Sequence, residues 1–185
     1  MQNWKDIMVL VVVVLIAVAS LVWVAGVTEP AREANKKAKQ QVALKFLFPK
    51  AHEFEERKLD NIVFFIPKSE RGEILGVIVP TETNKGYGGT IKMLVGVDLE
   101  GRIVKLKVTE HHETPGLGSK ATEDDSAFLK SFIGRSLEDT KFKVKKDGGD
   151  IDAVTSATIT SRAICDAVER GLRRFEKYRR QLIGN

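Results

Sequence analysis

The feature that most constrains how this chain can fold is an uncharged run of residues near its N-terminus. From Ile7 to Val27 the sequence holds no charged residue and is almost entirely apolar. A run of about twenty such residues is long enough to cross a bilayer as one helix. We therefore expect residues 1–28 to form a transmembrane anchor. A cleaved signal peptide is the alternative, because Ala17-Val18-Ala19 and Val24-Ala25-Gly26 resemble small-residue cleavage sites.

The charges that flank this run bear on its orientation. Lys5 and Asp6 precede it, and four basic residues follow it closely. By the positive-inside rule this asymmetry favours a cytoplasmic location for the part of the chain that follows the run. The four basic residues are Arg32, Lys36, Lys37 and Lys39.

A juxtamembrane helix is expected over residues 29–49. Thr28-Glu29-Pro30 is typical of a helix start, since proline is tolerated in the first turn and glutamate is favoured there. Pro49 is expected to end this helix. Its later part is apolar and should dock on a folded domain through Val42, Leu44, Phe46, Leu47 and Phe48.

Residues 50–185 are long enough for one domain with its own core and short for two. Short β-rich runs alternate there with turn signals, and Asp98-Leu99-Glu100-Gly101 predicts a hairpin. The fold class is therefore α+β, with an antiparallel sheet and packed helices. The expected strands are Asn61–Ile66, Glu73–Pro80, Thr90–Val97 and Arg102–Thr109, with a β segment at Lys141–Val144 before a Gly148-Gly149 turn.

Two helices complete the predicted domain. One covers Thr122–Ile133, with Thr122 or Ser126 as its cap. The other is the carboxy-terminal helix, where Ile164, Val168, Leu172 and Phe175 form one apolar stripe.

Charge and cysteine content narrow the function classes. The net charge is +5, but no basic patch interleaved with aromatic residues occurs, so we expect no nucleic-acid partner. Cys165 is the only cysteine. It is expected to be a small buried side chain, and the chain cannot form an intrachain disulfide or a cysteine-based metal site.

The segment before the last helix is unusually rich in hydroxyl groups. Asp152-Ala153-Val154-Thr155-Ser156-Ala157-Thr158-Ile159-Thr160-Ser161 places them where a helix begins and its N–H groups lack partners. Such a start attracts phosphate groups. The ordinary alternative is helix capping, but one cap residue is enough for that. A phosphate-bearing ligand is therefore the first hypothesis.

A second dense motif follows the last expected strand, at residues 110–120. Thr114-Pro115-Gly116 predicts a turn, and Gly116 and Gly118 would let a ligand approach the backbone. Adjacent ligands on an extended segment point to opposite faces, so His111, His112 and Glu113 are a weak metal candidate, and we expect no metal. Lys85-Gly86-Tyr87-Gly88-Gly89 is a third loop before a strand.

Taken in order, these three segments behind an apolar anchor resemble a known family. Gly86-Tyr87-Gly88-Gly89, His111-His112-Glu113-Thr114-Pro115-Gly116-Leu117-Gly118 and Asp152-Ala153-Val154-Thr155-Ser156-Ala157-Thr158 match its motifs. It is the FMN-binding domain family, with the covalent-FMN subunits of ion-translocating respiratory complexes. Its members include the G subunit of the Rnf electron transport complex and the C subunit of the sodium-pumping NADH:quinone reductase.

The resemblance implies an electron-transfer subunit whose FMN is attached by a phosphoester bond to Thr158. It implies that Asp152 is read by a separate flavin transferase that uses FAD. The partners would be the other subunits of the complex, and the subunit alone would have no complete catalytic activity. The domain would lie on the periplasmic side of the cell inner membrane. Thr155, Ser156, Ala157, Thr160, Glu113, Thr114, Gly116, Leu117, Tyr87 and Gly88 would surround the cofactor.

One residue departs from the family pattern, and two alternatives remain. Ser156 stands where the family usually has glycine, which restricts a left-handed backbone there. A membrane-tethered hydrolase could use Ser156, Thr158 or Thr160 with His111 or His112, but no Gly-x-Ser-x-Gly elbow occurs. A binding or assembly module without flavin is the other alternative.

Overall fold

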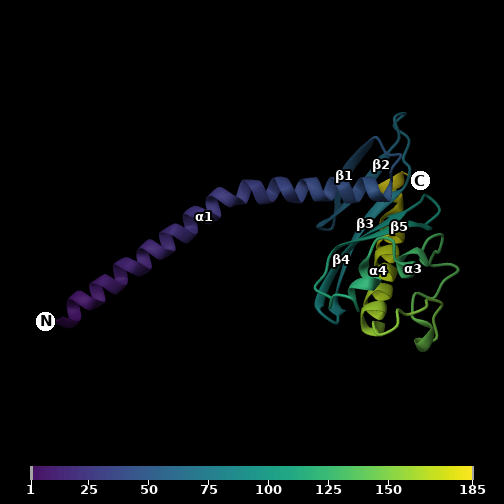
Figure 1. Ribbon diagram of the computed structural model, residues 1–185. Helices are drawn as coiled ribbons and strands as arrows, with labels where there is room; N and C mark the ends of the chain where they lie inside the picture. The colour runs from purple at the N-terminus through teal and green to yellow at the C-terminus, as the bar shows by residue number, and fades with distance from the viewer. Residues whose placement is uncertain (1, 185) are drawn as a thin grey trace. The chain divides into compact units, whose positions relative to one another are not determined.

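The computed structural model describes residues 2–184, without the side chains of residues 2, 3, 25–28, 30, 31 and 33. Its elements follow the order α1, five strands, two short helices, a 3₁₀ turn and α4 (Figure 1). The chain divides into two compact units, Met1–Val42 and Ala43–Asn185.

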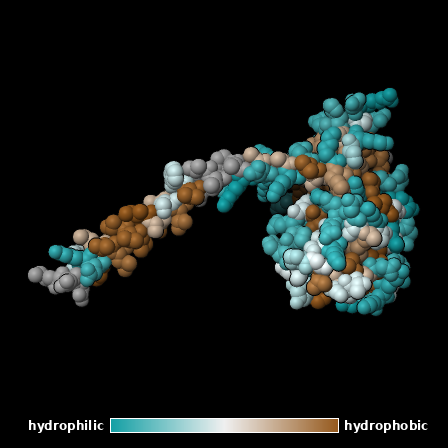
Figure 2. Space-filling view, viewed as in Figure 1, coloured by the Kyte–Doolittle hydropathy of each residue, from teal (hydrophilic) through white to brown (hydrophobic). Residues whose placement is uncertain are grey.

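The first unit is the major part of α1, which spans Gln2–Leu47 without interruption. Within it, the 21 residues Trp4–Val24 are long and apolar enough to cross a membrane, and none is buried within the protein. Figure 2 shows this stretch as a brown band on the surface. A new helix start at Thr28-Glu29-Pro30 is therefore not present, although the side chains of Thr28 and Pro30 lie outside the described ones.

The second unit is built on one antiparallel sheet in the order β1-β2-β3-β4-β5. Each strand pairs with the next one along the chain, so the sheet is a simple meander. The predicted hairpin at Asp98-Leu99-Glu100-Gly101 is confirmed, because it joins β4 to β5 and Gly101 N donates to Asp98 O. The strands are β1 Glu53–Leu59, β2 Ile62–Lys68, β3 Val77–Gly86, β4 Gly89–Val97 and β5 Ile103–Glu110.

Both faces of the central strands are covered. The helix α4, Thr158–Ile183, packs its apolar stripe on one face, where Phe64, Val79 and Val95 lie (Figure 1). On the other face, Leu44, Leu47 and Phe48 at the end of α1 pack on the alternate residues Phe65, Ile78 and Leu94. Because successive strand residues point to opposite faces, this two-sided burial explains the nearly continuous apolar runs in β2, β3 and β4.

The end of α1 docks as predicted, with one exception. Ala43, Leu44, Leu47 and Phe48 are buried, and Phe46 is half-buried. Val42 is 69% exposed, so it does not belong to this contact. The helix ends at Leu47, shortly before Pro49, in agreement with the expected stop.

The sequence did not predict β1. Its residues are mostly charged, because it is an edge strand with little surface to bury, and charge is typical of protected edges. Asp60 and Asn61 connect it to β2 with φ angles of 45° and 63°. Two consecutive left-handed residues are typical of a tight two-residue hairpin. Asn61 therefore belongs to a turn, not to the strand that was expected to begin there.

Two further expectations need correction. The helix predicted at Thr122–Ile133 is instead two short helices, α2 Ser119–Thr122 and α3 Ala127–Lys130. Ser126 does cap α3, accepting a hydrogen bond from Leu129 N at 3.1 Å, and its extended backbone separates the two helices. The β segment at Lys141–Val144 is reduced to a single bridge between Val144 and Ile151. The chain turns there into the 3₁₀ helix η1, Lys145–Asp147, and Gly148 follows with φ 76°.

Candidate functional site

The three motifs singled out in the sequence meet at one buried carboxylate. Glu113 is only 5% exposed. Its Oε1 accepts a hydrogen bond from Gly88 N at 3.2 Å, and its Oε2 accepts one from Thr160 Oγ1 at 2.7 Å. Glu113 therefore joins the loop between β3 and β4, its own loop after β5 and the first turn of α4.

This meeting depends on close backbone approach. A Cβ added to Gly88 would lie 1.8 Å from His112 O, and one added to Gly118 would lie 2.4 Å from Glu113 Oε2. Real Cβ atoms do not come this close, so any larger residue would push the loops apart. Neither glycine has a positive φ, which shows that space and not backbone angle requires them here.

The hydroxyl groups at the start of α4 divide into two sets. Thr160 and Ser161 are buried and bonded: Ser161 Oγ accepts from Val154 N at 3.0 Å and donates to Ala157 O at 2.9 Å. The side chains of Thr155, Ser156 and Thr158 form no hydrogen bond with any residue that the structure describes. Thr155 and Ser156 are exposed, and Thr158 is half-buried.

No side chain caps α4. Its N-cap residue is Ala157, which has no side-chain acceptor, and the helix begins at Thr158. The ordinary interpretation, that the hydroxyl run caps the helix, is therefore not what the structure shows. The first N–H groups of a helix have no partner within the helix, and they carry a partial positive charge. An anion could bind them beside Thr158.

Ser156 has the left-handed backbone that the family glycine would favour. Its φ is 64°. Such an angle is uncommon for a residue other than glycine, asparagine or aspartate, and it is often found at functional sites. The turn before α4 thus has, at Ser156, a backbone conformation that glycine would adopt without strain.

Three exposed apolar residues are next in sequence to residues of the cluster around Glu113. Tyr87 is 71% exposed, Leu117 is 48% exposed and Ile159 is 49% exposed. Each immediately precedes a residue that touches or closely approaches the Glu113 carboxylate. Over residues 43–184, the only other large hydrophobic side chains so exposed are Leu99 and Ile133. Exposed apolar surface is therefore concentrated at the cluster, as in a ligand site.

His111 forms hydrogen bonds within the segment that follows β5, and none to the hydroxyl groups of the described residues 155–161. Its Nδ1 accepts from Glu113 N at 3.3 Å, and its Nε2 lies 3.0 Å from Thr122 Oγ1. The Thr122 hydroxyl donates to Ser119 O at 2.8 Å, so the proton between His111 and Thr122 is assigned to Nε2. Because His111 and Thr160 are bonded elsewhere, the structure gives no support to a serine or threonine hydrolase built on them.

Asp152 precedes α4 and pairs with Lys145, outside the hydrogen bonds of the Glu113 cluster. Its Oδ2 is 2.7 Å from Lys145 Nζ, and its side chain is 77% exposed. Nearby, Arg162 in the first turns of α4 holds Asp147 through two hydrogen bonds of 2.6 and 2.7 Å. Hydrogen bonds from Arg162 lower the pKa of Asp147 below its usual value. The residues Asp152 and Arg162 of these two ion pairs flank, in sequence, the segment that leads to Thr158.

Thr114 and Gly116, which were also predicted as site residues, lie in the turn that follows Glu113. Thr114 O accepts from Leu117 N and Ser119 N, both at 3.2 Å, and Gly116 has φ 77°, which closes the predicted turn. Ile159 and Lys145 were not predicted as site residues, because neither stands out in the sequence. Among the described residues, no cluster of histidine, cysteine or acidic side chains could hold a metal ion.

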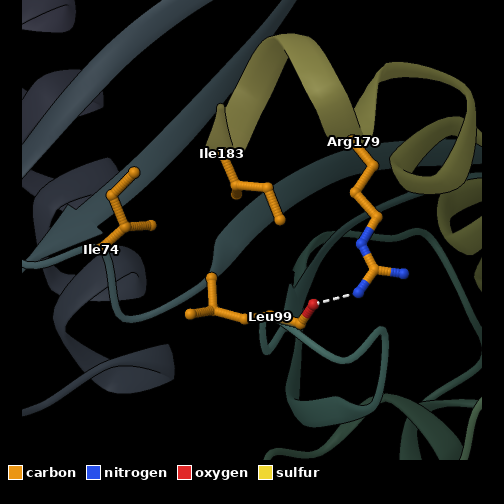
Figure 3. A pocket seen from close by; sticks show the side chains of 4 residues that line it. All are labelled: Ile74, Leu99, Arg179 and Ile183. Carbon is orange, nitrogen blue, oxygen red and sulfur yellow. Dashed lines mark hydrogen bonds between the residues drawn. The ribbon is translucent and has the colours of Figure 1, made fainter. Parts of the chain in front are cut away.

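A separate hollow lies at the other end of α4. It has a volume of about 430 Å³ and is lined by Ile74, Leu99, Arg179 and Ile183. Figure 3 shows the Arg179 guanidinium turned to the carbonyl oxygen of Leu99, with the three apolar side chains opposite. Arg179 and Thr158 lie near opposite ends of this 26-residue helix, so the hollow is not part of the cluster.

Comparisons with known proteins agree with this geometry. Residues 86–173, which contain all three motif segments, match the FMN-binding domain family. The G subunit of the ion-translocating oxidoreductase complex of Pseudomonas aeruginosa is 34% identical over 168 residues, which is 82% of this chain and 78% of that protein. The chain therefore belongs to the FMN-binding domain family that includes these G subunits.

Other relatives cover less of the chain. The corresponding G subunit of Salmonella typhi is 44% identical over 109 residues, which is 57% of this chain and 52% of that protein. The chain thus spans about half the length of several curated relatives that it matches. The crystal structure of Shewanella oneidensis NqrC is similar with a TM-score of 0.54 and 25% identity, covering 75% of this chain and 74% of that chain. The α+β fold is confirmed by this neighbour.

Proposed function

We propose that this chain is an electron-transfer subunit of a membrane-bound, ion-translocating oxidoreductase complex, and that it carries FMN through a phosphoester bond to Thr158. One observation carries the proposal. Thr158 is a half-buried hydroxyl without a partner among the described residues, at an uncapped helix start beside exposed apolar side chains. Membership in the FMN-binding domain family and similarity to the G subunits support it.

The residues present suit both ends of FMN. The open N–H groups at the start of α4 suit the phosphate, and Tyr87, Leu117 and Ile159 offer apolar surface to a ring system. A negative charge at a helix start gains about 0.3–1 kcal/mol. This gain is too small to retain a cofactor, which explains why a covalent ester is needed. When bound, FMN supplies reversible electron transfer, while the protein orients it and tunes its potential.

Attachment would require a separate flavin transferase with FAD as donor. The Thr158 Oγ1 forms a bond to the phosphorus of the FMN half. The P–O bond to the other phosphate breaks, AMP leaves, and the hydroxyl proton passes to a base on the transferase. Asp152 is exposed and held by Lys145, so it is accessible for recognition. The covalent link, the transferase and the role of Asp152 are all part of the proposal.

The proposal also includes the setting of the domain. The helix segment Trp4–Val24 would anchor the chain in the cell inner membrane, with the domain on the periplasmic side. Arg32, Lys36 and Lys37 after the span favour the opposite side by charge alone. Resemblance to the respiratory subunits favours the periplasmic side. The partners would be the other subunits of the complex, because one span without an internal charge offers no ion path.

Coexpression with a flavin transferase tests the proposal. The full chain should fluoresce on a denaturing gel, and the peptide that contains Thr158 should gain the mass of FMN less water. Thr158→Val should abolish both signals, while Thr158→Ser should keep them. Ser131→Ala removes a hydroxyl at the C-cap of α3, outside the motif, and should leave labelling unchanged. Unlabelled wild-type chain, or flavin attached to another residue, would refute the proposal and favour a flavin-free assembly module.

A further inference from the structure

The cluster contains a buried carboxylate with no cationic side chain bonded to it among the residues that the structure describes. Glu113 is 5% exposed, and its two oxygens are bonded to a backbone N–H and to a threonine hydroxyl. Removing a carboxylate from water is costly, and neutral hydrogen bonds offset that cost only in part. A group of this kind is not an efficient way to stabilise a fold. Its value to the protein therefore lies in what its two bonds hold in place.

Both bonds connect segments distant in sequence. The bond to Gly88 spans 25 residues, and the bond to Thr160 spans 47 residues. The glycines make room for the carboxylate itself, because a Cβ at Gly86 would lie 2.6 Å from Oε1 and one at Gly118 would lie 2.4 Å from Oε2. The surrounding backbone is thus shaped around the Glu113 side chain.

The bond to Thr160 also fixes the rotation of the first turn of α4. Thr160 is 1% exposed and points inward to Glu113. Residues two apart on a helix are turned by about 200° from each other. With Thr160 held inward, Thr158 must face away from the carboxylate, and it is the half-exposed residue of the pair. Without this bond, the frayed start of a helix could turn Thr158 elsewhere.

The same carboxylate sets the spacing of the apolar rim. Tyr87, Leu117 and Ile159 each lie one residue before a position that Glu113 contacts or closely approaches. The three rim residues therefore keep their positions relative to Thr158 only while the three segments remain joined. Glu113 thus lies where the segments that carry Thr158 and the three apolar residues meet.

We propose that Glu113 is a positioning residue for flavin attachment, and that it acts through its bond to the Thr160 hydroxyl. The bond clamps the first turn of α4 to the two loops, so that Thr158 is presented outward in a fixed place beside the rim. This inference rests on the function proposed above. It assigns to Thr160 a role distinct from that of Thr158: Thr160 orients the site and is not itself modified.

The test compares two substitutions of Thr160 in the full chain. Thr160→Val keeps the side-chain shape and removes the hydroxyl, while Thr160→Ser keeps the hydroxyl. Purified unlabelled chain is mixed with transferase and FAD, and labelling is followed by gel fluorescence. We expect Thr160→Val to be labelled at least about tenfold more slowly, because small displacements of a reacting group cost that much or more. Thr160→Ser should be labelled at the wild-type rate.

The reduction potential of the attached flavin is the second readout, since loss of stability alone would not shift it. It should change in labelled Thr160→Val and return to the wild-type value in Thr160→Ser. If Thr160→Val fails to fold, as judged by circular dichroism, Thr160→Ala replaces it. This substitution also removes the hydroxyl that donates to Glu113 and adds no bulk, so the same slow labelling is expected.

The outcomes separate this inference from the proposed function. Unlabelled wild-type chain would refute the function and the inference together. If the wild type is labelled and Thr160→Val has the same labelling rate and flavin reduction potential, only the positioning role is refuted. A slow Thr160→Val variant that Thr160→Ser does not restore would also refute it, because the hydroxyl would then not be the active feature.

Discussion

Arg162 and Asp147 form a two-point ion pair across the entry to α4, with Nε to Oδ2 at 2.6 Å and Nη2 to Oδ1 at 2.7 Å. Asp147 belongs to η1, and Arg162 lies four residues after Thr158. The pair therefore joins the residues before and after the segment that carries Ser156 and Ala157. Parallel bonds between a guanidinium and a carboxylate are more specific in geometry than single ones. The contribution of these bonds to stability depends on the negative charge of Asp147.

The pair should make this segment sensitive to acid. Hydrogen bonds from Arg162 lower the pKa of Asp147 from 3.8. A carboxyl group with a lowered pKa adds stability above its unfolded pKa, and loses it as the pH falls through the folded value. The protection factors of residues 145–157 in hydrogen exchange, which are corrected for the intrinsic pH dependence of exchange, should thus fall as the pH drops below about 3.8 in the wild type. In Arg162→Gln they should already be lower at pH 7, and this decrease with acid should disappear; an unchanged decrease would contradict this.

Two glycine-to-alanine substitutions should differ sharply in how much stability they cost. Gly88→Ala places a Cβ 1.8 Å from the backbone oxygen of His112, which can move only if the loop after β5 shifts. We expect a loss of about 3 kcal/mol in the free energy of unfolding and little flavin labelling. Gly134→Ala is the control, because its φ is 80° but no atom lies within 4 Å. It should lose only about 1–2 kcal/mol and keep labelling. Equal losses in urea unfolding would show that contact at Gly88 is unimportant.

The left-handed Ser156 predicts an unusual order of substitutions. At φ 64°, glycine is unstrained and a β-branched residue is strongly disfavoured. Ser156→Val should be less stable than Ser156→Gly by about 1–2 kcal/mol, and it should be labelled more slowly. Ser131 has φ −65°, so the same two changes there should not favour glycine. Thermal unfolding of the four variants measures the order, and a common order at both positions would argue against strain at Ser156.

The elements that the sequence predicted correctly are those with local signals. The hairpin at Asp98-Leu99-Glu100-Gly101 depends on turn residues next to one another, and α4 depends on an apolar stripe within one helix. The charged edge strand β1 lacks such a signal, because its pairing with β2 and not its side chains makes it a strand.

In the candidate site, too, local features could be predicted from the sequence and long-range contacts could not. The hydroxyl run and the glycine loops are visible in the sequence, and they indicated a phosphate ligand. The bond between Glu113 and Thr160 spans 47 residues, and no pattern along the chain pairs them. The sequence also left open whether the hydroxyl run caps the helix. Only the structure shows that Ala157 is the N-cap and that Thr160 and Ser161 are bonded within the fold.

Protease access tests the proposed orientation. With the domain on the periplasmic side, trypsin added to intact spheroplasts should cleave it after its exposed lysine and arginine residues. Positive charges such as Lys36 and Lys37 predict the opposite arrangement. A cytoplasmic marker protein should remain intact in the same sample, and detergent should expose both. Protection of the domain in intact spheroplasts would reverse the orientation proposed here.

Cys165 offers a probe of the core beneath the site. It is 1% exposed in α4, and burial raises the pKa of its thiol to about 12. Because the thiolate is the reactive form, an aromatic disulfide reagent at pH 8 should not modify the folded protein, but should modify one thiol per chain in denaturant. The unfolded thiol ionises near pH 9.0 and the folded thiol only near 12, so stability should fall as the pH rises between these values. Cys165→Ala removes this contribution, and its unfolding free energy should decline less over the same range. Rapid modification of the folded wild type, or parallel declines in the two proteins, would show that the thiol is not shielded from water.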